Sequence, residues 1–205
     1  MTSVTPPLAG LRILDFSTLL PGPLAGLLLA EAGAEVIKVE RPGTGDEMRA
    51  YAPSFDDAGG NFALLNRGKA SLTADLKDAG DRDHVRGLAR DADVVIEQFR
   101  PGVMDRLGLG YAALSADNPR LIYCSITGYG QSGPQAQRAG HDLNYLAEAG
   151  ILGLTRGADG APVLPPVLAA DIAGGAYPAV MNILMALVRR DATGRGCHLD
   201  VAMAD

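Results

Sequence analysis

His141 has the sequence context of a catalytic base. It lies within RAGHDLNY, where a helix is expected to begin at the next residue, and the positive end of a helix disfavours the imidazolium and keeps the ring neutral. A capping or hydrogen-bonded histidine fits the same spacing, so both interpretations stay open. The other two histidines, His84 in a charged helical segment and His198 in the last expected strand, are most simply structural.

Asp171 is a carboxylate at an otherwise apolar junction. It follows the run 163–170 and precedes IAGGAY, where a second helix is expected to open. As an N-cap it would contribute about 1 kcal/mol and need no further function, and a helix start favours its unprotonated form. Gly174 and Gly175, however, each cost about 1 kcal/mol inside a helix. Their small size predicts room for a ligand beside the carboxylate.

Four basic residues stand beside glycine or proline where strands are expected to end. They are Arg41, Arg67, Lys69 and Arg100, in the segments ERPG, NRGK and FRPG. In an open parallel sheet the ligand crevice lies at the carboxyl ends of the strands, and these cations bind phosphates and carboxylates. The pattern predicts that they converge on one anionic ligand, although any one of them alone is most simply a solvated loop charge.

The first expected strand, helix and strand, with Glu40 closing the second strand, invite a dinucleotide-binding interpretation. The connecting loop argues against it. It reads STLLPGP instead of GxGxxG, and Pro21 and Pro23 lack the amide hydrogens that a pyrophosphate would need. A metal site is not expected either, because His, Cys and carboxylates form no cluster at ligand spacing.

Alternating strands and helices must position these residues. Strands are expected over 12–16, 35–39, 94–99, 121–126 and 198–202, and helices over 24–32, 81–90, 103–107, 111–116, 142–152 and from 172 to about 190, with a turn at 21–23. This alternation predicts an α/β fold with a mostly parallel sheet and helices on both faces. A strand at the extreme end suggests that a further segment normally follows.

Length and composition indicate one globular unit. The 205 residues are 47% hydrophobic and 20% charged, which excludes a disordered, collagen-like or coiled-coil chain. The formal charge of −6 argues against nucleic-acid or anionic-membrane partners. Two cysteines, Cys124 and Cys197, and a start without leader features predict a cytoplasmic protein. The apolar stretches 23–30 and 179–188 are shorter than the roughly 20 residues of a membrane helix.

Long ordered blocks of the sequence resemble the family III CoA-transferases (CaiB/BaiF type), and within them the α-methylacyl-CoA racemase branch. The resemblance covers essentially the whole chain. Its blocks are LAGLRILDFSTLLPGPLAGLLLAEAGAEVIKVERPG, NRGKASLTADLK, FRPGVMDRLGLGYAAL, NPRLIYCSITGYGQSGP, AGHDLNYLA, AADIAGGA and GRGCHLDVAMAD. AGHDLNYLA points to racemases, because members that transfer CoA rely on the aspartate at 171 and need no histidine at 141.

The resemblance implies a Rossmann-like large domain that binds CoA, joined to a small domain, in an interlocked dimer. It assigns the nucleotide and phosphates to Arg41, Arg67, Lys69 and Arg100, the thioester end to Gly140, Asp142 and Tyr145, and the acid/base pair to His141 and Asp171. Family members are considerably longer, so residues 1–205 match the large domain, and the small domain and return segment are absent, trimmed or supplied by a second chain. CoA enters as part of the substrate, and no tightly bound cofactor is implied.

The implied reaction inverts the α-carbon of a 2-methylacyl-CoA. One base removes the α-proton, an enolate forms, and the opposite residue returns a proton to the other face. His141 and Asp171 would take these roles, and the backbone amides of Asp142 and Leu143 would stabilise the enolate oxygen. Two alternatives stay open: CoA transfer between carboxylic acids through an intermediate on Asp171, and a non-catalytic fragment or subunit that binds acyl-CoA.

Overall fold

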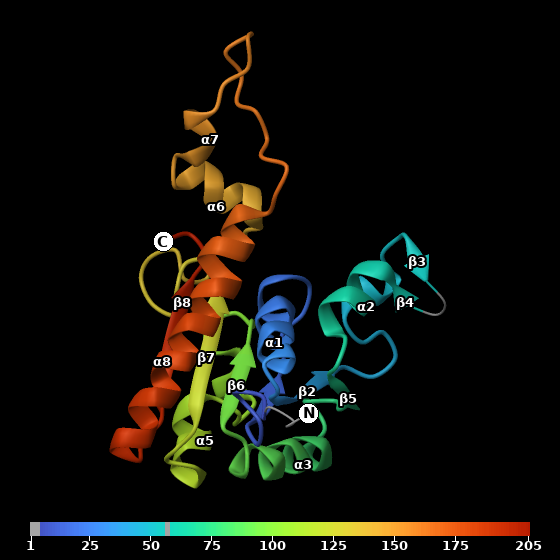
Figure 1. Ribbon diagram of the computed structural model, residues 1–205, viewed down its shortest axis with the longest axis vertical. Coiled ribbons are helices and arrows are strands. Elements are labelled where there is room, and N and C mark those ends of the chain that lie inside the picture. Colours follow the sequence, from blue (N-terminus) through green and yellow to red (C-terminus); the bar gives the residue numbers. More distant parts are fainter. Residues whose placement is uncertain (1–4, 56–57) are drawn as a thin grey trace.

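A six-stranded parallel sheet forms the centre of the computed structural model, which describes residues 5–55 and 58–205 (Figure 1). Its strands are β1 (Arg12–Asp15), β2 (Glu35–Glu40), β5 (Ala70–Thr73), β6 (Val94–Glu97), β7 (Ile122–Thr127) and β8 (Cys197–Ala202), in the spatial order β5-β2-β1-β6-β7-β8. Each neighbouring pair runs parallel. The chain builds outward from β1 on one side and then returns to β6 on the other, which is the doubly wound arrangement. The predicted α/β fold is confirmed.

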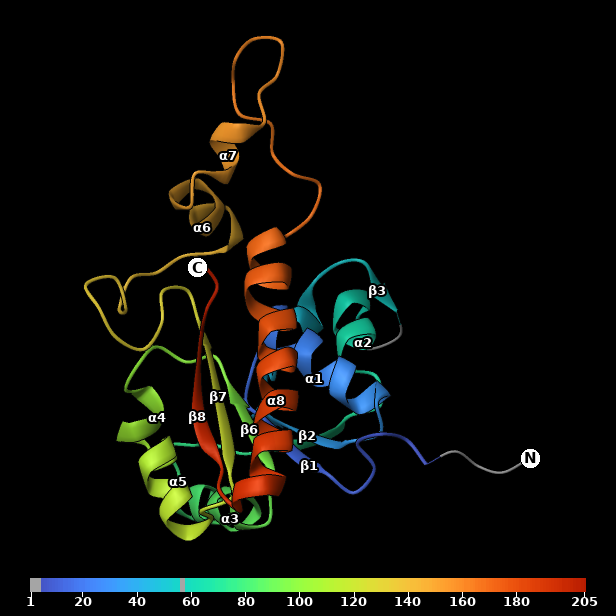
Figure 2. The same ribbon diagram turned by 60° about the vertical axis from the view of Figure 1, so that its left-hand side comes forward.

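Alternate side chains of the central strands enter two separate cores. Val94 of β6 lies in the core with residues of α1 (Pro21–Glu31) and α8 (Tyr177–Thr193), whereas its neighbour Val95 packs against the opposite set of helices. That set comprises α3 (Ala79–Arg90), α4 (Val103–Arg106) and α5 (Tyr111–Asp117). Figure 2 shows these two layers on either side of the sheet. Burial of both faces explains why the strands are apolar runs.

Helix α1 begins at Pro21, so the predicted turn at 21–23 is wrong. Proline costs little in the first turn of a helix, because its missing amide hydrogen would have no intrahelical partner there and its φ is already close to the helical value. Both prolines are buried. They therefore start the helix that follows the β1 loop.

Between residues 41 and 80 the sequence predicts no element, yet the structure contains several. They are the 3-10 helix η1 (Glu47–Ala50), the hairpin strands β3 (Ser54–Phe55) and β4 (Ala58–Gly59), the helix α2 (Gly60–Asn66) and the edge strand β5. These elements are short, and β5 is largely exposed, so no hydrophobic periodicity marks them.

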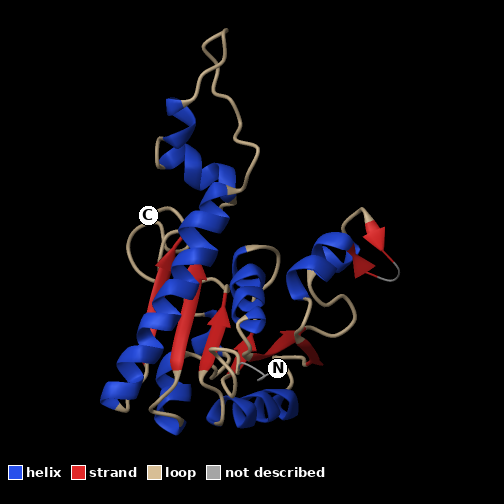
Figure 3. Cartoon of the chain, in the orientation of Figure 1, coloured by secondary structure: helices blue, strands red, loops and turns tan. Residues whose placement is uncertain are grey.

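Two further helices differ from their prediction by more than a small shift at one end. The helix expected over 142–152 is broken into α6 (Asp142–Glu148) and α7 (Ile151–Leu154) at Gly150, which has φ 80°, a value that glycine adopts without steric cost. The helix expected from residue 172 begins two residues earlier as a π-helical segment, η2 (Ala170–Ala176), and continues into α8. In Figure 3 α6, α7 and the loop that returns to η2 project beyond the sheet.

The continuous helix Ala170–Thr193 is long and apolar enough to cross a membrane by length and composition alone, although each apolar stretch in the sequence is shorter. In the structure its inner side packs on the sheet through Ala179 and Ile183. Near its end Arg190 is buried and forms an ion pair of 2.9 Å with Asp93. One side of this helix therefore belongs to the core.

Both cysteines are free thiols, and Cys124 is fully buried in the sheet. Residues 1–4, part of the start in which no leader is expected, lie outside the described residues. The cytoplasmic location stays a prediction.

Candidate active site

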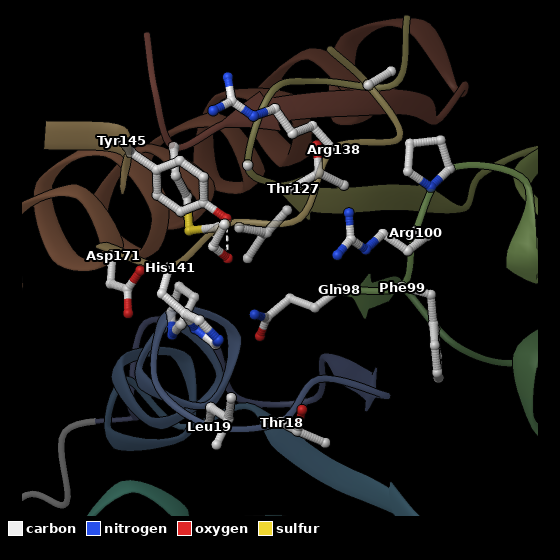
Figure 4. A pocket seen from close by; sticks show the side chains of 17 residues that line it. Thr18, Leu19, Gln98, Phe99, Arg100, Thr127, Arg138, His141, Tyr145 and Asp171 are labelled. Atoms are coloured by element: carbon white, nitrogen blue, oxygen red, sulfur yellow. Dashed lines mark hydrogen bonds between the residues drawn. The ribbon is translucent and has the colours of Figure 1, made fainter. Parts of the chain in front are cut away.

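A pocket of about 180 Å³ opens at the carboxyl ends of β1, β6 and β7 (Figure 4). The chain order of the strands reverses between β1 and β6, and ligands of doubly wound sheets bind at such a reversal. Loop residues that follow the three strands form one wall, and the starts of α6 and η2 form the other. We call this cavity the His141 pocket; it is lined by Thr18, Leu19, Gln98, Arg100, His141 and Asp171 among others.

His141 lies at the N-cap of α6, as the sequence predicts. Its backbone is extended, with φ −129° and ψ 174°, and its amide donates a hydrogen bond of 2.9 Å to Oδ1 of Asn144. Asn144 therefore closes the start of the helix. Figure 4 shows the imidazole inside the pocket, near the Asp171 carboxylate.

Asp171 lies in the same pocket, but it is not an N-cap. It is the second residue of η2, whose N-cap is Ala169, and its own amide donates to Oδ1 of Asp142 at 2.9 Å. Burial and, to a smaller extent, the nearby charge of Asp142 raise the pKa of Asp171 to about 6, whereas His141 acts in the opposite direction. The expectation that a helix start keeps this carboxyl readily ionised is wrong, because desolvation outweighs the helix dipole here.

A cavity lies beside Asp171, but Gly174 and Gly175 do not line it; these glycines make room for the chain itself. A Cβ on Gly174 would lie 2.4 Å from the carbonyl oxygen of Met203, and one on Gly175 would lie 3.0 Å from Cβ of Pro21. The glycines therefore allow η2 to approach the end of β8 and the start of α1.

Tyr145 holds the loop that carries His141. Its hydroxyl donates to the carbonyl oxygen of Gly140 at 2.6 Å, and its ring fills the space where a Cβ on Gly128 or Gly140 would stand. Burial raises the pKa of Tyr145 to about 12, so the hydroxyl stays a donor. Gly140 and Tyr145 both line the pocket, whereas Asp142 is 3% exposed and its carboxylate binds the Asp171 amide instead of facing the cavity.

The four predicted phosphate-binding cations do not converge. Arg100 lines the His141 pocket, and Arg41 lines a neighbouring groove. Arg67 lies outside both, where it pairs with Glu31 and donates to the carbonyl oxygen of Leu64 at 2.7 Å.

Lys69 is buried, and its ammonium group donates three hydrogen bonds within the protein. It donates to Asp15, to the carbonyl oxygen of Pro23 and to Asn66, each at 2.9 Å. Burial lowers the pKa of Lys69, and the charge of Asp15 acts in the opposite direction. An ammonium has three donors, so none is left for a phosphate. Lys69 therefore supports the β1 loop and α1.

The groove beside Arg41 is larger and more apolar than the His141 pocket. Its volume is about 420 Å³, and we call it the Arg41 groove. Apolar, basic and acidic side chains line it, among them Val39, Leu76, Val103, Leu107, Arg41, Lys77, Glu40, Asp46, Glu47 and Asp75. Thr18 and Phe99 line both cavities, so the two adjoin at the end of β1.

Sequence reasoning missed three residues of these cavities. Arg138 and Gln98 line the His141 pocket, and Lys77 lines the Arg41 groove. Gln98 also accepts a hydrogen bond of 2.9 Å from the Gly22 amide. Arg138 stands three residues before His141, which was a usable signal, whereas nothing in the local pattern marks Gln98. Within residues 5–55 and 58–205, no three His, Cys, Asp or Glu side chains group closely enough to hold a metal.

Comparison with known proteins assigns a family. The family described as CoA-transferase family III matches residues 8–205. The acetyl-CoA:oxalate CoA-transferase of Acetobacter aceti is 43% identical, and the alignment covers 100% of this chain and 54% of the transferase. The alpha-methylacyl-CoA racemase of Homo sapiens is 39% identical, and the alignment covers 97% of this chain and 48% of the racemase.

A solved structure agrees with the fold. The crystal structure of a CAIB/BAIF family protein from Brucella suis superimposes with a TM-score of 0.93 at 43% identity, covering 98% of this chain and 54% of that one. The chain therefore spans about half the length of the curated relatives that it matches.

Proposed function

The chain belongs to CoA-transferase family III, and from this premise we propose that it binds an acyl-CoA thioester and inverts the carbon next to the thioester carbonyl. One observation carries the proposal: the imidazole of His141 and the carboxyl group of Asp171 line the same pocket. Inversion needs such a pair, because a proton must leave one face of the carbon and another must reach the opposite face.

The two cavities support binding of a long substrate with a charged and an apolar end. The Arg41 groove offers apolar walls for a nucleotide base, and Arg41 and Lys77 can pair with its phosphates. The His141 pocket would take the thioester, with Arg100 at its wall. Arg67 and Lys69 are left out of this assignment because their charges are already paired.

In the proposed reaction His141 removes the α-proton of one enantiomer, and the electron pair moves to the thioester oxygen as an enolate. The amides of Asp142 and Leu143 at the start of α6 would donate to that oxygen. Asp171, protonated in part because its pKa is about 6, returns a proton to the opposite face. The opposite enantiomer reverses the two roles.

CoA transfer is the second candidate, favoured by the relatives named CoA-transferases that align with the whole chain. The Asp171 carboxylate would attack the thioester carbonyl, the carbon–sulfur bond would break, and CoA thiolate would leave. The thiolate would then attack the aspartyl carbonyl, release the free acid and leave CoA on Asp171 as a thioester. A second carboxylate would attack that thioester to form a new anhydride and expel CoA thiolate, which would attack the acyl carbonyl to give the new acyl-CoA and the free Asp171 carboxylate. This route gives His141 no part in the chemistry.

Incubation with a 2-methylacyl-CoA in heavy water separates the candidates. Inversion predicts deuterium at the α-carbon together with loss of configuration, and the variants His141→Ala and Asp171→Ala should each abolish inversion while exchange persists from opposite enantiomers. His84→Ala and Asp91→Asn, at exposed positions, serve as controls that should leave both signals unchanged.

Other outcomes contradict the inversion proposal. If hydroxylamine traps an adduct on Asp171, no deuterium enters the α-carbon and His141→Ala is harmless, CoA transfer is the function. If the protein binds CoA but gives neither exchange nor adduct, it is an acyl-CoA-binding subunit or fragment.

We further propose that residues 1–205 form one CoA-binding domain and that a second copy, or a complementary chain, packs against it. Exposed apolar side chains on α8 and on the projecting segment support this, among them Leu154, Leu164, Met185 and Val188. No tightly bound cofactor, nucleic acid or membrane forms part of the proposal.

A further inference from the structure

The loop after β1 contains a strained residue. Leu19 has φ 62°, and within residues 5–55 and 58–205 it is the residue other than glycine with a positive φ. Leucine in this left-handed region brings its Cβ too close to the backbone, which costs free energy. Such a conformation persists only where the surrounding structure enforces it, and it is concentrated at functional sites.

Buried charges enforce it here. Asp15 accepts the amide of Ser17 at 2.9 Å, the ammonium of Lys38 donates to the carbonyl oxygen of Ser17 at 2.7 Å, and Asp46 accepts the amide of Leu19 at 3.3 Å. Lys38 and Asp46 also form an ion pair of 2.9 Å with each other. The loop backbone is therefore fixed on both sides of Thr18.

The Lys38–Asp46 pair is costly to bury. The two side chains are 2% and 0% exposed, and a buried ion pair returns its desolvation penalty only when its geometry and further hydrogen bonds are favourable. The additional hydrogen bonds of this pair include those to the β1 loop. A pair that served packing alone could be replaced by apolar side chains, whereas one that fixes a backbone could not.

The loop lies where the two cavities meet. Thr18 lines both the His141 pocket and the Arg41 groove, and Leu19 lines the former. A ligand that fills both must pass over these two residues. We propose that Lys38 and Asp46 are positioning residues whose ion pair holds Ser17–Leu19 in the strained conformation that lets one ligand cross from groove to pocket; the identity of that ligand as a CoA thioester rests on the proposed function.

A rescue experiment tests this role. Glycine adopts positive φ without strain, so Leu19→Gly should reduce the need for the ion pair. We expect Asp46→Asn to raise the Kd for acetyl-CoA about ten-fold in calorimetry. The Kd of the double variant Leu19→Gly/Asp46→Asn should lie within about three-fold of the Kd of Leu19→Gly alone. Asp117→Asn on α5, which removes a surface ion pair with Arg86 of α3, is the control and should bind as the parent does.

Two results overturn the inference while the proposed function stands. One is unchanged acetyl-CoA binding by Asp46→Asn. The other is a double variant whose loss of acetyl-CoA affinity equals the sum of the two single losses. A merely structural role for Asp46 predicts this sum, because Leu19→Gly would then not restore binding. If Asp46→Asn does not fold because the Lys38 charge is stranded, Lys38→Met/Asp46→Asn replaces it in the same cycle.

Urea unfolding tests the same coupling without CoA, in the parent, the two single variants Leu19→Gly and Asp46→Asn, and the double variant. The inference predicts that the Asp46→Asn loss of stability is smaller in the Leu19→Gly background. If this coupling is present but the parent protein does not bind acetyl-CoA, the proposed function is wrong and the positioning of the loop stands. If acetyl-CoA binds and the coupling is absent, the inference is wrong.

Discussion

Arg41 and Arg100 differ from Arg67 and Lys69 in what their charges are free to bind. Arg41 is largely exposed and is separated from Glu47 by 3.6 Å, and Arg100 donates to the carbonyl oxygen of Gln137 at 3.0 Å. Arg67 and Lys69 instead have carboxylate partners in direct contact. All four are basic residues within two positions of a glycine, so close contact with a carboxylate in the fold separates them.

Changing the free arginines should therefore weaken CoA binding, and changing the paired one should not. We expect Arg41→Ala and Arg100→Ala each to raise the Kd for CoA about ten-fold, because a charge-assisted contact to phosphate is lost. Arg67→Ala is the matched control, measured in the same calorimetric titration. Equal affinities for all three variants and the parent would remove both arginines from the binding site.

Glu97 is a buried carboxyl at the end of β6. Its Oε2 accepts the amide of Phe99 at 2.8 Å. Burial raises the pKa of Glu97 to about 7, although the Ser125 hydroxyl and the Phe99 amide favour the ionised form. The folded protein therefore binds a proton here that the unfolded chain releases at lower pH.

The raised pKa makes stability depend on pH in a defined direction. Between the usual pKa of 4.5 and about 7 the folded state holds more protons than the unfolded state, so stability falls as pH rises through this window. Glu97→Gln stays neutral and can still accept the Phe99 amide. We expect it to be about 2–3 kcal/mol more stable than the parent at pH 8 and nearly equal at pH 4.5 in urea unfolding.

Glu35→Gln is the control for this series, because Glu35 lies on the surface beside Arg12. Its stability difference from the parent should be small at both pH values. A Glu97→Gln protein whose advantage does not grow between pH 4.5 and pH 8 would show that Glu97 ionises normally.

At the scale of elements, α1 approaches the buried Asp15–Lys69 ion pair closely through Gly26. A Cβ at this position would lie 2.8 Å from Oδ2 of Asp15 and 2.9 Å from Nζ of Lys69. Gly87 lies inside α3 with open space around it. Both glycines lie inside a helix, but a Cβ would be crowded at Gly26 and would meet no atom at Gly87.

Alanine at these two positions should therefore have opposite effects. Gly87→Ala should stabilise the protein by about 1 kcal/mol through helix propensity. Gly26→Ala should destabilise it by about 2 kcal/mol, since overpacking against a buried ion pair outweighs the propensity gain. Both are measured by urea unfolding, and a stabilised Gly26→Ala protein would show that α1 has room to move.

At the scale of the whole molecule, one side of α8 is left uncovered. Apolar side chains recur along it at helical spacing: Tyr177, Met181, Leu184, Met185 and Val188 are all exposed, the last at 73%. A contiguous apolar patch of this kind marks an interaction surface.

We expect the purified protein to self-associate through this side of α8. Light scattering should give a mass above that of one chain, and Met185→Glu should shift the distribution towards the monomer. Ala116→Glu, which adds the same charge at an exposed position of α5, should leave it unchanged. A parent protein that stays monomeric at all concentrations would refute this expectation.

The sequence by itself determined the alternation of strands and helices, the parallel sheet and the start of α6 beside His141. These features follow from neighbouring residues. The apolar runs of β6 and β7 mark strands buried on both faces, and the helical pattern beginning at Asp142 places His141 at its N-cap. Local signals also brought His141 and Asp171 into consideration, and the fold places both in one pocket.

Tertiary structure alone decided which of these groups is chemically available. Lys69 is neutralised by Asp15, 54 positions away in the chain, and the pKa of Asp171 reflects burial and Asp142, 29 positions away. Position 174 requires glycine because the backbone of Met203 passes beside it. Desolvation and ion pairing depend on contacts between distant segments, and those contacts exist only once the sheet has brought the segments together.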